Sequence, residues 1–104
     1  VKYETFIFDA LPMATRPLVV EADRSEEFAP IKNAEGSDSV HTSQMAQTAR
    51  AAKWLSQSGV EIVTGSSGQS AAQIEIRSSS ATCPEDLSLC ELPAKLGAGE
   101  RFLV

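Results

Sequence analysis

One amphipathic segment constrains the fold of this chain more than any other feature, because it alone has the length and periodicity of a helix of several turns. Apolar side chains recur at helical spacing from residue 42 to residue 57. The stripe is formed by Met45, Ala49, Ala52 and Leu55, with Trp54 beside it. Thr42 or Ser43 is expected to cap the helix, and Gly59 stands where a helix commonly stops.

The residues after this helix have the pattern of short strands. Residues 60–63 are β-rich, and residues 72–76 alternate with period two, so that Ile74 and Ile76 share one face. Glycine and serine between residues 64 and 70 predict a flexible hairpin connection. The tail is expected to contain a short helix at 85–92, a turn at 97–99 and a closing strand at 101–104. A mixed α/β fold follows.

Ahead of the helix, the pattern from residue 2 to residue 33 predicts two short strands and a turn. Phe6 and Phe8 are two residues apart, so a strand would point both to the same face. The second strand is expected at 18–22, with Pro17 at its first position, where a missing backbone donor is tolerated. Taken alone, two phenylalanines on a strand are most simply core residues.

A single lysine follows this strand pair on a stiffened stem. Ser25 can cap a brief helix at 26–28, and Arg24 and Glu27 are expected to form a salt bridge across the turn. Pro30 favours an extended chain as it reaches Lys32. A positioned lysine suits phosphate recognition, whereas a solvated loop lysine is the alternative that residue type alone would favour.

The same region carries a specific pattern of residue types, F-I-F-D-A-L-P at 6–12 and V-V-E-A-D-R-S-E-E-F-A-P-I-K-N at 19–33. It resembles the C-terminal third of the UDP-N-acetylhexosamine pyrophosphorylases and the wider UDP-sugar pyrophosphorylase family. The matching positions are Phe6, Phe8, Asp9, Glu21, Arg24, Glu27, Phe28, Pro30, Lys32 and Asn33. At 40–42 the chain reads Val-His-Thr where the family usually has proline and threonine-alanine, so a loop contact to substrate is not carried over.

The resemblance implies a Rossmann-like nucleotide-diphospho-sugar transferase fold of the GT-A type. Residues 1–58 would be the C-terminal part of the catalytic domain, and residues 59–104 a small β-rich C-terminal lobe. The reaction would transfer UMP from UTP to a sugar 1-phosphate, with N-acetylglucosamine 1-phosphate as the expected acceptor, releasing pyrophosphate. Lys32 would contact the phosphate of the sugar nucleotide, and Phe6 and Phe8 would line the sugar pocket, where they fit a hexose or an N-acetylhexosamine.

The resemblance also implies Mg²⁺ as a cofactor, bound mainly by regions of such an enzyme that this chain does not match. Asp9, Glu21 and Asp23 could suggest a magnesium cluster, but solvated carboxylates are the simpler interpretation, and we assign no metal ligand. The family's glycine-rich nucleotide loop has no counterpart here, so we expect no turnover by the chain alone. The rival hypothesis is a noncatalytic truncated or dimerisation module.

Composition narrows the classes of protein to which this chain could belong. A net charge of −5 argues against a nucleic-acid surface, and no apolar run has the length of a membrane span. The chain begins with valine, which suggests a piece of a longer polypeptide, and the cytoplasm is the expected location. Cys83 and Cys90 are expected to be reduced, and His41 to be exposed and neutral.

Overall fold

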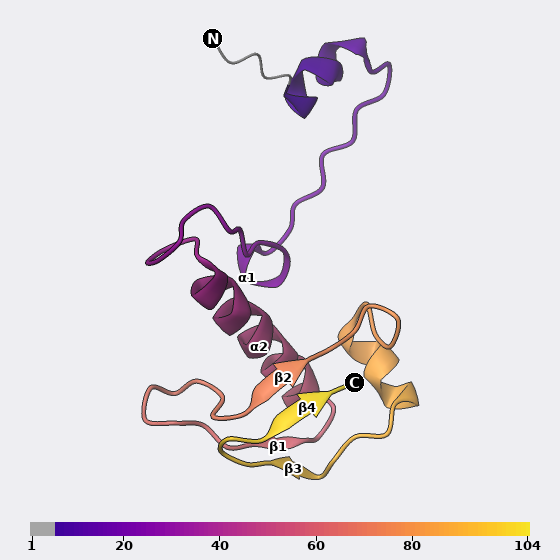
Figure 1. Ribbon diagram of the computed structural model, residues 1–104. Helices are drawn as coiled ribbons and strands as arrows, with labels where there is room; N and C mark the ends of the chain where they lie inside the picture. The colour runs from indigo at the N-terminus through magenta and orange to yellow at the C-terminus, as the bar shows by residue number, and fades with distance from the viewer. Residues whose placement is uncertain (1–5) are drawn as a thin grey trace.

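The computed structural model describes residues 6–104 as a small mixed α/β structure in which one long helix lies across two minimal sheets (Figure 1). Two of its helical segments, η1 and η2, are 3₁₀ helices. The elements in chain order are η1 (Ile7–Met13), α1 (Arg24–Glu27), α2 (Val40–Gln57), β1 (Glu61–Ile62), β2 (Gln73–Glu75), η2 (Pro84–Leu89), β3 (Lys95–Leu96) and β4 (Arg101–Leu103). The α/β class expected from the sequence is confirmed at this level.

Helix α2 is the predicted helix, and its start differs from the prediction by one turn. Ser39 is the N-cap: its hydroxyl oxygen accepts from the Thr42 amide at 3.3 Å, and the Thr42 hydroxyl oxygen accepts from the Ser39 amide at 2.9 Å. Thr42 therefore completes the cap from inside the helix instead of forming it. At the other end Gly59 adopts φ of 92°, a left-handed conformation that confirms the predicted stop.

The strands pair in parallel, which the sequence analysis did not anticipate. β1 pairs with β3 and β2 pairs with β4, with Ile74 opposite Phe102 in the second sheet. The predicted hairpin between β1 and β2 is wrong as a strand pairing. An antiparallel bridge between Thr64 and Ser70 closes that turn, but the chain then diverges, and the Gln73 amide donates to the Glu100 carbonyl at 2.8 Å. The returning C-terminal segment supplies the partner strands.

The core lies between α2, the two sheets and η2. It consists of Ala51, Trp54, Leu55, Val60, Ala72, Ile74, Ala81, Leu87 and Leu96, all buried. The predicted stripe is only partly correct, because Leu55 is fully buried and Ala52 packs against the core, whereas Ala49 is exposed. The sheets lie beneath the C-terminal half of α2, so the buried face there is formed by Ala51, Trp54 and Leu55.

The short helix expected at 85–92 is present as the 3₁₀ helix η2, and the expected closing strand is present as β4. Asp86 stabilises the start of η2, since its carboxylate accepts from the Thr82 amide at 2.9 Å and the Thr82 hydroxyl at 3.0 Å. These hydrogen bonds hold the pKa of Asp86 below its ordinary value. Cys83 and Cys90 are both free thiols, as expected.

The N-terminal part of the described chain departs most from prediction. Phe6 and Phe8 lie at η1 instead of on a strand, and residues 18–22 are unpaired coil; residues 2–5 of the predicted first strand lie outside the described residues. Strands need a neighbour to satisfy their backbone groups, and within residues 6–104 nothing pairs with this segment. Asp9 instead accepts from the Phe6 amide at 3.3 Å and closes a helical turn.

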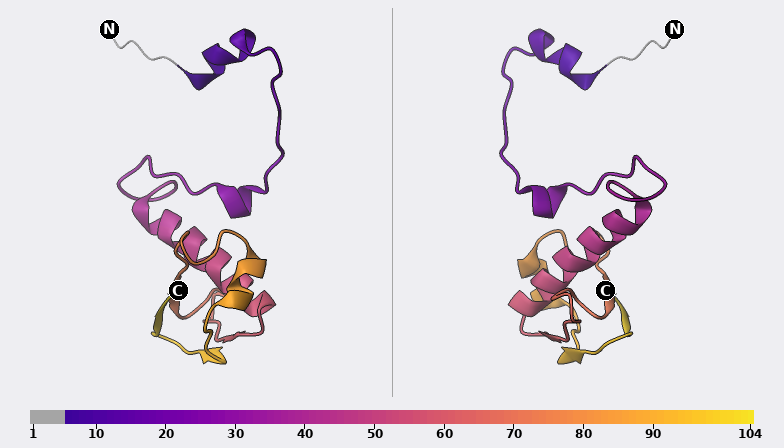
Figure 2. Two further views of the ribbon diagram at one scale, coloured as in Figure 1. Left: turned by 90° about the vertical axis from the view of Figure 1, so that its right-hand side faces the viewer. Right: turned by 90° about the vertical axis from the view of Figure 1, so that its left-hand side faces the viewer.

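Residues 6–22, which we call the arm, stand away from residues 23–104, which we call the lobe, in every view (Figure 2). The radius of gyration is 17.6 Å, against about 13 Å for a compact domain of this length. No helix in the described part of the chain is long and apolar enough to cross a membrane. A domain boundary after residue 58 stays a prediction, although α2 packs against both sheets.

Candidate functional site

Lys32 lies at the base of a closed loop. Its amide and that of Asn33 both donate to the Asp38 carbonyl, at 2.6 and 3.0 Å, and the Asn33 side-chain amide donates to the Ser37 carbonyl at 2.7 Å. The side chain of Lys32 is 66% exposed, and its Nζ lies 3.9 Å from the Asp38 carboxylate. An exposed ion pair of this length contributes little to stability. The ammonium is therefore accessible, while its backbone is held.

The loop from Asn33 to Ser39 is fastened to the start of α2. Gly36 and Asp38 adopt positive φ values of 78° and 52°, which turn the chain sharply before the helix. The Ser39 hydroxyl donates to the Gly36 carbonyl at 2.8 Å, and Ser39 is only 1% exposed. The loop is thus ordered by the same residue that caps α2.

The segment before Lys32 begins at the short helix α1, whose N-cap is Asp23. Its carboxylate accepts from the Ser25 amide and the Ser25 hydroxyl, both at 2.8 Å. These bonds lower the pKa of Asp23. The predicted cap at Ser25 is therefore wrong by two residues, because the Asp23 carboxylate accepts from the Ser25 amide in the first turn.

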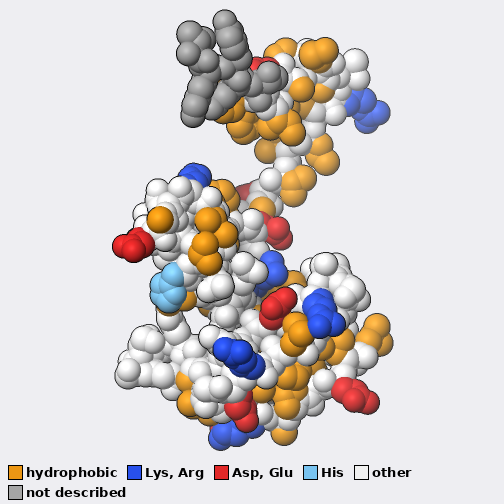
Figure 3. Space-filling view, viewed as in Figure 1, with side chains coloured by type: hydrophobic (Ala, Val, Ile, Leu, Met, Phe, Trp, Pro, Cys, Tyr) orange, Lys and Arg blue, Asp and Glu red, His pale blue; other side chains and the backbone are white. Residues whose placement is uncertain are grey.

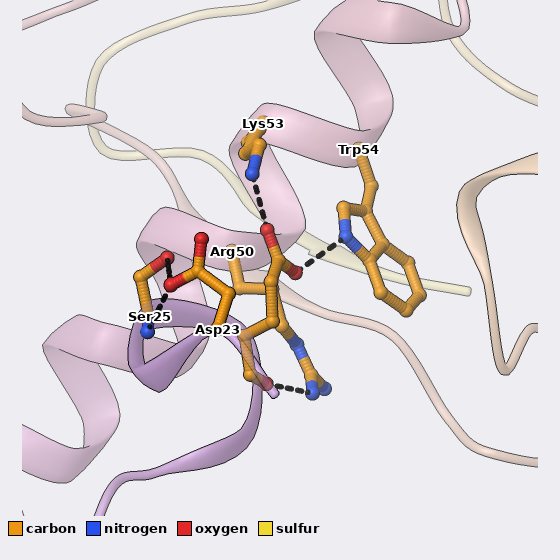
Figure 4. Close-up of polar contacts among 6 residues, drawn as sticks. Asp23, Ser25, Arg50, Lys53 and Trp54 are labelled. Carbon is orange, nitrogen blue, oxygen red and sulfur yellow. Dashed lines mark hydrogen bonds and ion pairs between the residues drawn. The ribbon is translucent and has the colours of Figure 1, made fainter. Parts of the chain in front are cut away.

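Glu26 joins α1 to α2 through both of its carboxylate oxygens (Figure 4). One oxygen pairs with Lys53, and the other accepts from Trp54 Nε1 at 3.0 Å. Arg50 donates to the Glu26 carbonyl at 3.1 Å and lies over the Trp54 ring, 5.0 Å from its centroid. We call these four residues, Glu26, Arg50, Lys53 and Trp54, the Glu26 clamp.

Within the Glu26 clamp, the pKa values of Glu26 and Lys53 are shifted in the directions expected of an ion pair. Hydrogen bonds from Lys53 and Trp54 hold the pKa of Glu26 below its ordinary value. The hydrogen bond to Glu26 raises the pKa of Lys53. Both shifts favour the charged forms, so the contact is an ion pair across the neutral pH range.

Two further contacts fix the chain between the clamp and Lys32. Ser43, which is 4% exposed, donates its hydroxyl to the Ala29 carbonyl at 3.0 Å. Arg24 lies over the Phe28 ring, 4.0 Å from its centroid. The salt bridge expected between Arg24 and Glu27 is not found among the described residues, because the guanidinium stacks on the phenyl ring instead.

Phe6 and Phe8 are not brought close to Lys32. Both lie in the arm with 58% and 71% of their surface exposed, and the arm and the Lys32 loop stay apart in both Figure 1 and Figure 2. Apolar side chains cover much of the visible face of the arm (Figure 3). The substrate-binding roles of these three residues stay predictions.

Two hollows lie on the lobe, one on each side of Arg50. The larger, about 650 Å³, runs between α2 and the β2–β4 sheet, and the smaller, about 210 Å³, lies between α1 and α2. Arg50 and Gln47 line both, and neither is lined by Lys32, Phe6 or Phe8. Across residues 6–104, no group of three or more His, Cys, Asp or Glu side chains is arranged to hold a metal ion.

The sequence analysis missed the clamp, although a signal for it is present. Lys53 and Trp54 follow Arg50 by three and four residues, so both lie beside Arg50 on the helix surface. A helix surface with two cations and an indole N–H predicts an acceptor opposite it. The sequence does not say which of the many carboxylates that acceptor is.

Comparison with known proteins gives a partial similarity. The chain is 54% identical over 37 residues to UDP-N-acetylglucosamine diphosphorylase 2 of Arabidopsis thaliana, and 51% identical over 37 residues to UDP-N-acetylglucosamine diphosphorylase 1 of the same plant. Each match covers 36% of this chain and 7% of the relative. No protein-family model and no solved structure matches.

Proposed function

We propose, from this partial similarity to plant UDP-N-acetylglucosamine diphosphorylases, that the chain forms part of a UDP-sugar pyrophosphorylase. Such an enzyme transfers UMP from UTP to a sugar 1-phosphate and releases pyrophosphate. N-acetylglucosamine 1-phosphate is the acceptor we propose. The observation that carries the proposal is the similarity itself, at about half identity; the fixed backbone and exposed ammonium of Lys32 support it.

Lys32 would act on the phosphates. In this reaction an oxygen of the sugar phosphate attacks the α-phosphorus in line while pyrophosphate leaves, so two polyanions must be brought together. An ammonium placed against the developing charge supplies about 3 kcal/mol, the scale of one oxyanion donor. The contact with Asp38 is long and solvated, and a phosphate oxygen can therefore replace it at small cost.

The arm would complete a larger sheet and the sugar side of the pocket. Leu18, Val19 and Val20 are 86%, 93% and 75% exposed, an unusual state for three consecutive apolar residues with strand propensity. In a GT-A type catalytic domain, which we propose for the longer protein, these residues would pair as a strand. Phe6 and Phe8 would then face the sugar, whether a hexose or an N-acetylhexosamine.

Mg²⁺ would neutralise the triphosphate of UTP in the proposed reaction. The lobe and the arm together offer no cluster of metal-binding side chains among residues 6–104. We propose that the phosphates of the substrate and other regions of the enzyme hold the ion, and we assign no metal ligand in this chain. From the partial similarity we also propose a catalytic part, residues 1–58, and a small β-rich C-terminal lobe, residues 59–104. This C-terminal lobe is only a portion of the lobe of residues 23–104 defined above.

The test is pyrophosphate release from UTP and N-acetylglucosamine 1-phosphate by the natural polypeptide that contains this chain. We expect Lys32→Ala to lower kcat/KM by about 100-fold, the usual effect of losing one positioned charge. Lys95→Ala is the matched control, since Lys95 is also an exposed lysine in a surface ion pair, with Glu61. An active parent whose kcat/KM is unchanged by Lys32→Ala would refute the role of Lys32, and an inactive parent would refute the proposed reaction.

A further inference from the structure

We infer that Glu26 is a positioning residue, whose clamp onto α2 holds the stem that carries Lys32. The stem is defined as residues 26–33. What Lys32 does once positioned rests on the proposed function above, whereas the clamp itself rests only on contacts within this chain. Glu26 is six residues from Lys32 along the chain, so it acts through the backbone and touches no reacting atom.

The stem is attached to the α2 region at three successive points. Glu26 binds Arg50, Lys53 and Trp54 in the C-terminal half of α2; Ala29 accepts from Ser43 in its first turns; Lys32 and Asn33 donate to Asp38 just before it. The partners' numbers fall as the stem's numbers rise, so the stem runs antiparallel to α2. Each attachment removes freedom from the chain that ends at Lys32.

The first attachment is the strongest chemically. Both carboxylate oxygens of Glu26 are used, one by an ammonium and one by an indole N–H that has no acceptor function of its own. The side chain of Glu26 is only 21% exposed, so water competes weakly for it. The second and third attachments are neutral hydrogen bonds, which are individually weaker.

The clamp is separate from the core of the lobe on the stem side. No residue of α1 is buried, and the core cluster contains only Trp54 among the clamp residues. Loss of the Glu26 carboxylate should therefore release the stem while α2 and the sheets stay folded. Because of this separation, a positioning role can be told apart from a role in general stability. The first is measured at the amides of the stem, and the second at the core amides of α2.

The first experiment uses the chain itself and reads the stem directly. Hydrogen exchange of the Lys32 and Asn33 amides, followed by NMR, is compared in the parent, Glu26→Gln, Glu26→Ala and the control Glu91→Gln, which removes an exposed carboxylate elsewhere on the lobe. We expect the two amides to exchange about tenfold faster in both Glu26 variants, and the core amides of α2 to change by clearly less than that. The emission of Trp54, the only tryptophan, should shift in the same variants.

The result that overturns the inference is equally direct. Glu26→Ala could shift the tryptophan spectrum and leave exchange at Lys32 and Asn33 unchanged. That result would show that the clamp forms in the parent but does not hold the stem. An equal acceleration throughout α2 would show that Glu26 stabilises the lobe as a whole and does not act specifically on the stem. Glu26→Asp keeps the charge and should restore part of the protection, which a role based on side-chain volume alone would not reproduce.

The second experiment uses the natural polypeptide and links the clamp to Lys32. Glu26→Gln should lower kcat/KM by about tenfold, and it should have little further effect in a Lys32→Ala background, because both changes remove the same ammonium from its place. Fully additive effects would overturn the inference even if Lys32 is essential. If the parent shows no uridylyl transfer, the proposed function fails, and the exchange experiment still decides whether Glu26 holds the stem.

Discussion

Trp54 Nε1 donates a hydrogen bond of 3.0 Å to the carboxylate of Glu26, and this contact joins the short helix α1 to the long helix α2 across 28 residues of sequence. Trp54 is otherwise a core residue, 8% exposed, whose ring packs with the apolar side chains of the lobe. One side chain thus belongs to the core through its ring and to the clamp through its nitrogen. The position of the Trp54 ring in the core thereby helps to fix the segment that leads to Lys32.

The bonds that Glu26 makes to Lys53 and Trp54 cause the free energy of unfolding to decrease as the pH falls into the acid range. The ordinary pKa of Glu26 is 4.5, and its bonds to Lys53 and Trp54 lower it in the folded chain. A depressed carboxyl pKa contributes stability that is fully present above the ordinary value and is lost as pH falls through the folded value. We expect the difference in free energy of unfolding between the parent and Glu26→Gln to shrink below about pH 4.5, the ordinary pKa of the group.

Urea unfolding followed by Trp54 fluorescence, at pH 7 and at several values below 4.5, measures this difference. Asp86 also has a lowered pKa, and the parent and Glu26→Gln both retain it, so its contribution cancels in the comparison. A difference between parent and Glu26→Gln that stays constant down to acid pH would contradict the ion pair.

Two leucines of η2 test the position of the core. Leu87 is 0% exposed and Leu89 is 89% exposed, although they are two residues apart on the same short helix. Leu87→Ala should destabilise the lobe by about 2–5 kcal/mol, through lost burial and the cavity left behind. Leu89→Ala should change the free energy of unfolding by less than about 0.5 kcal/mol. Equal losses of stability in thermal or urea unfolding would show that η2 packs differently from the structure.

The arm should be energetically separate from the lobe. The triple replacement Leu18→Ser, Val19→Ser and Val20→Ser removes the three exposed apolar side chains. We expect it to change the free energy of unfolding of this chain by less than about 1 kcal/mol. In the natural polypeptide the same triple replacement should destabilise strongly, if those residues pair as a strand there. Urea unfolding of both proteins checks this, and a large loss of stability in this chain alone would place the arm against the lobe.

Local elements were predictable from the sequence where they depend on neighbours along the chain. The helix ending before Gly59, the alternation that buries Ile74 and the strand at 101–103 all follow from spacing and turn chemistry. The true cap at Ser39 was missed because Ser39, Thr42 and Ser43 are all acceptable caps by type, and only the conformation at Asp38 selects among them.

Strand pairing and the site could not be predicted in the same way. Glycine and serine between β1 and β2 favour a hairpin, but the pairing depends on where the C-terminal segment returns, a contact between residues about thirty apart. Phe6 and Phe8 have the alternation of a strand, and the described chain gives that strand no neighbour to pair with.

The sequence by itself therefore determined the helix, the strand-forming segments and the proline-bearing stem that carries Lys32, because these depend on side-chain chemistry within a few residues. Tertiary structure alone decided that the strands pair in parallel, that Ala51, Trp54 and Leu55 are buried on α2, and that Glu26 is the carboxylate that meets Lys53 and Trp54. Those outcomes depend on which distant segments pack together, and the free energy of that packing is a property of the whole folded chain.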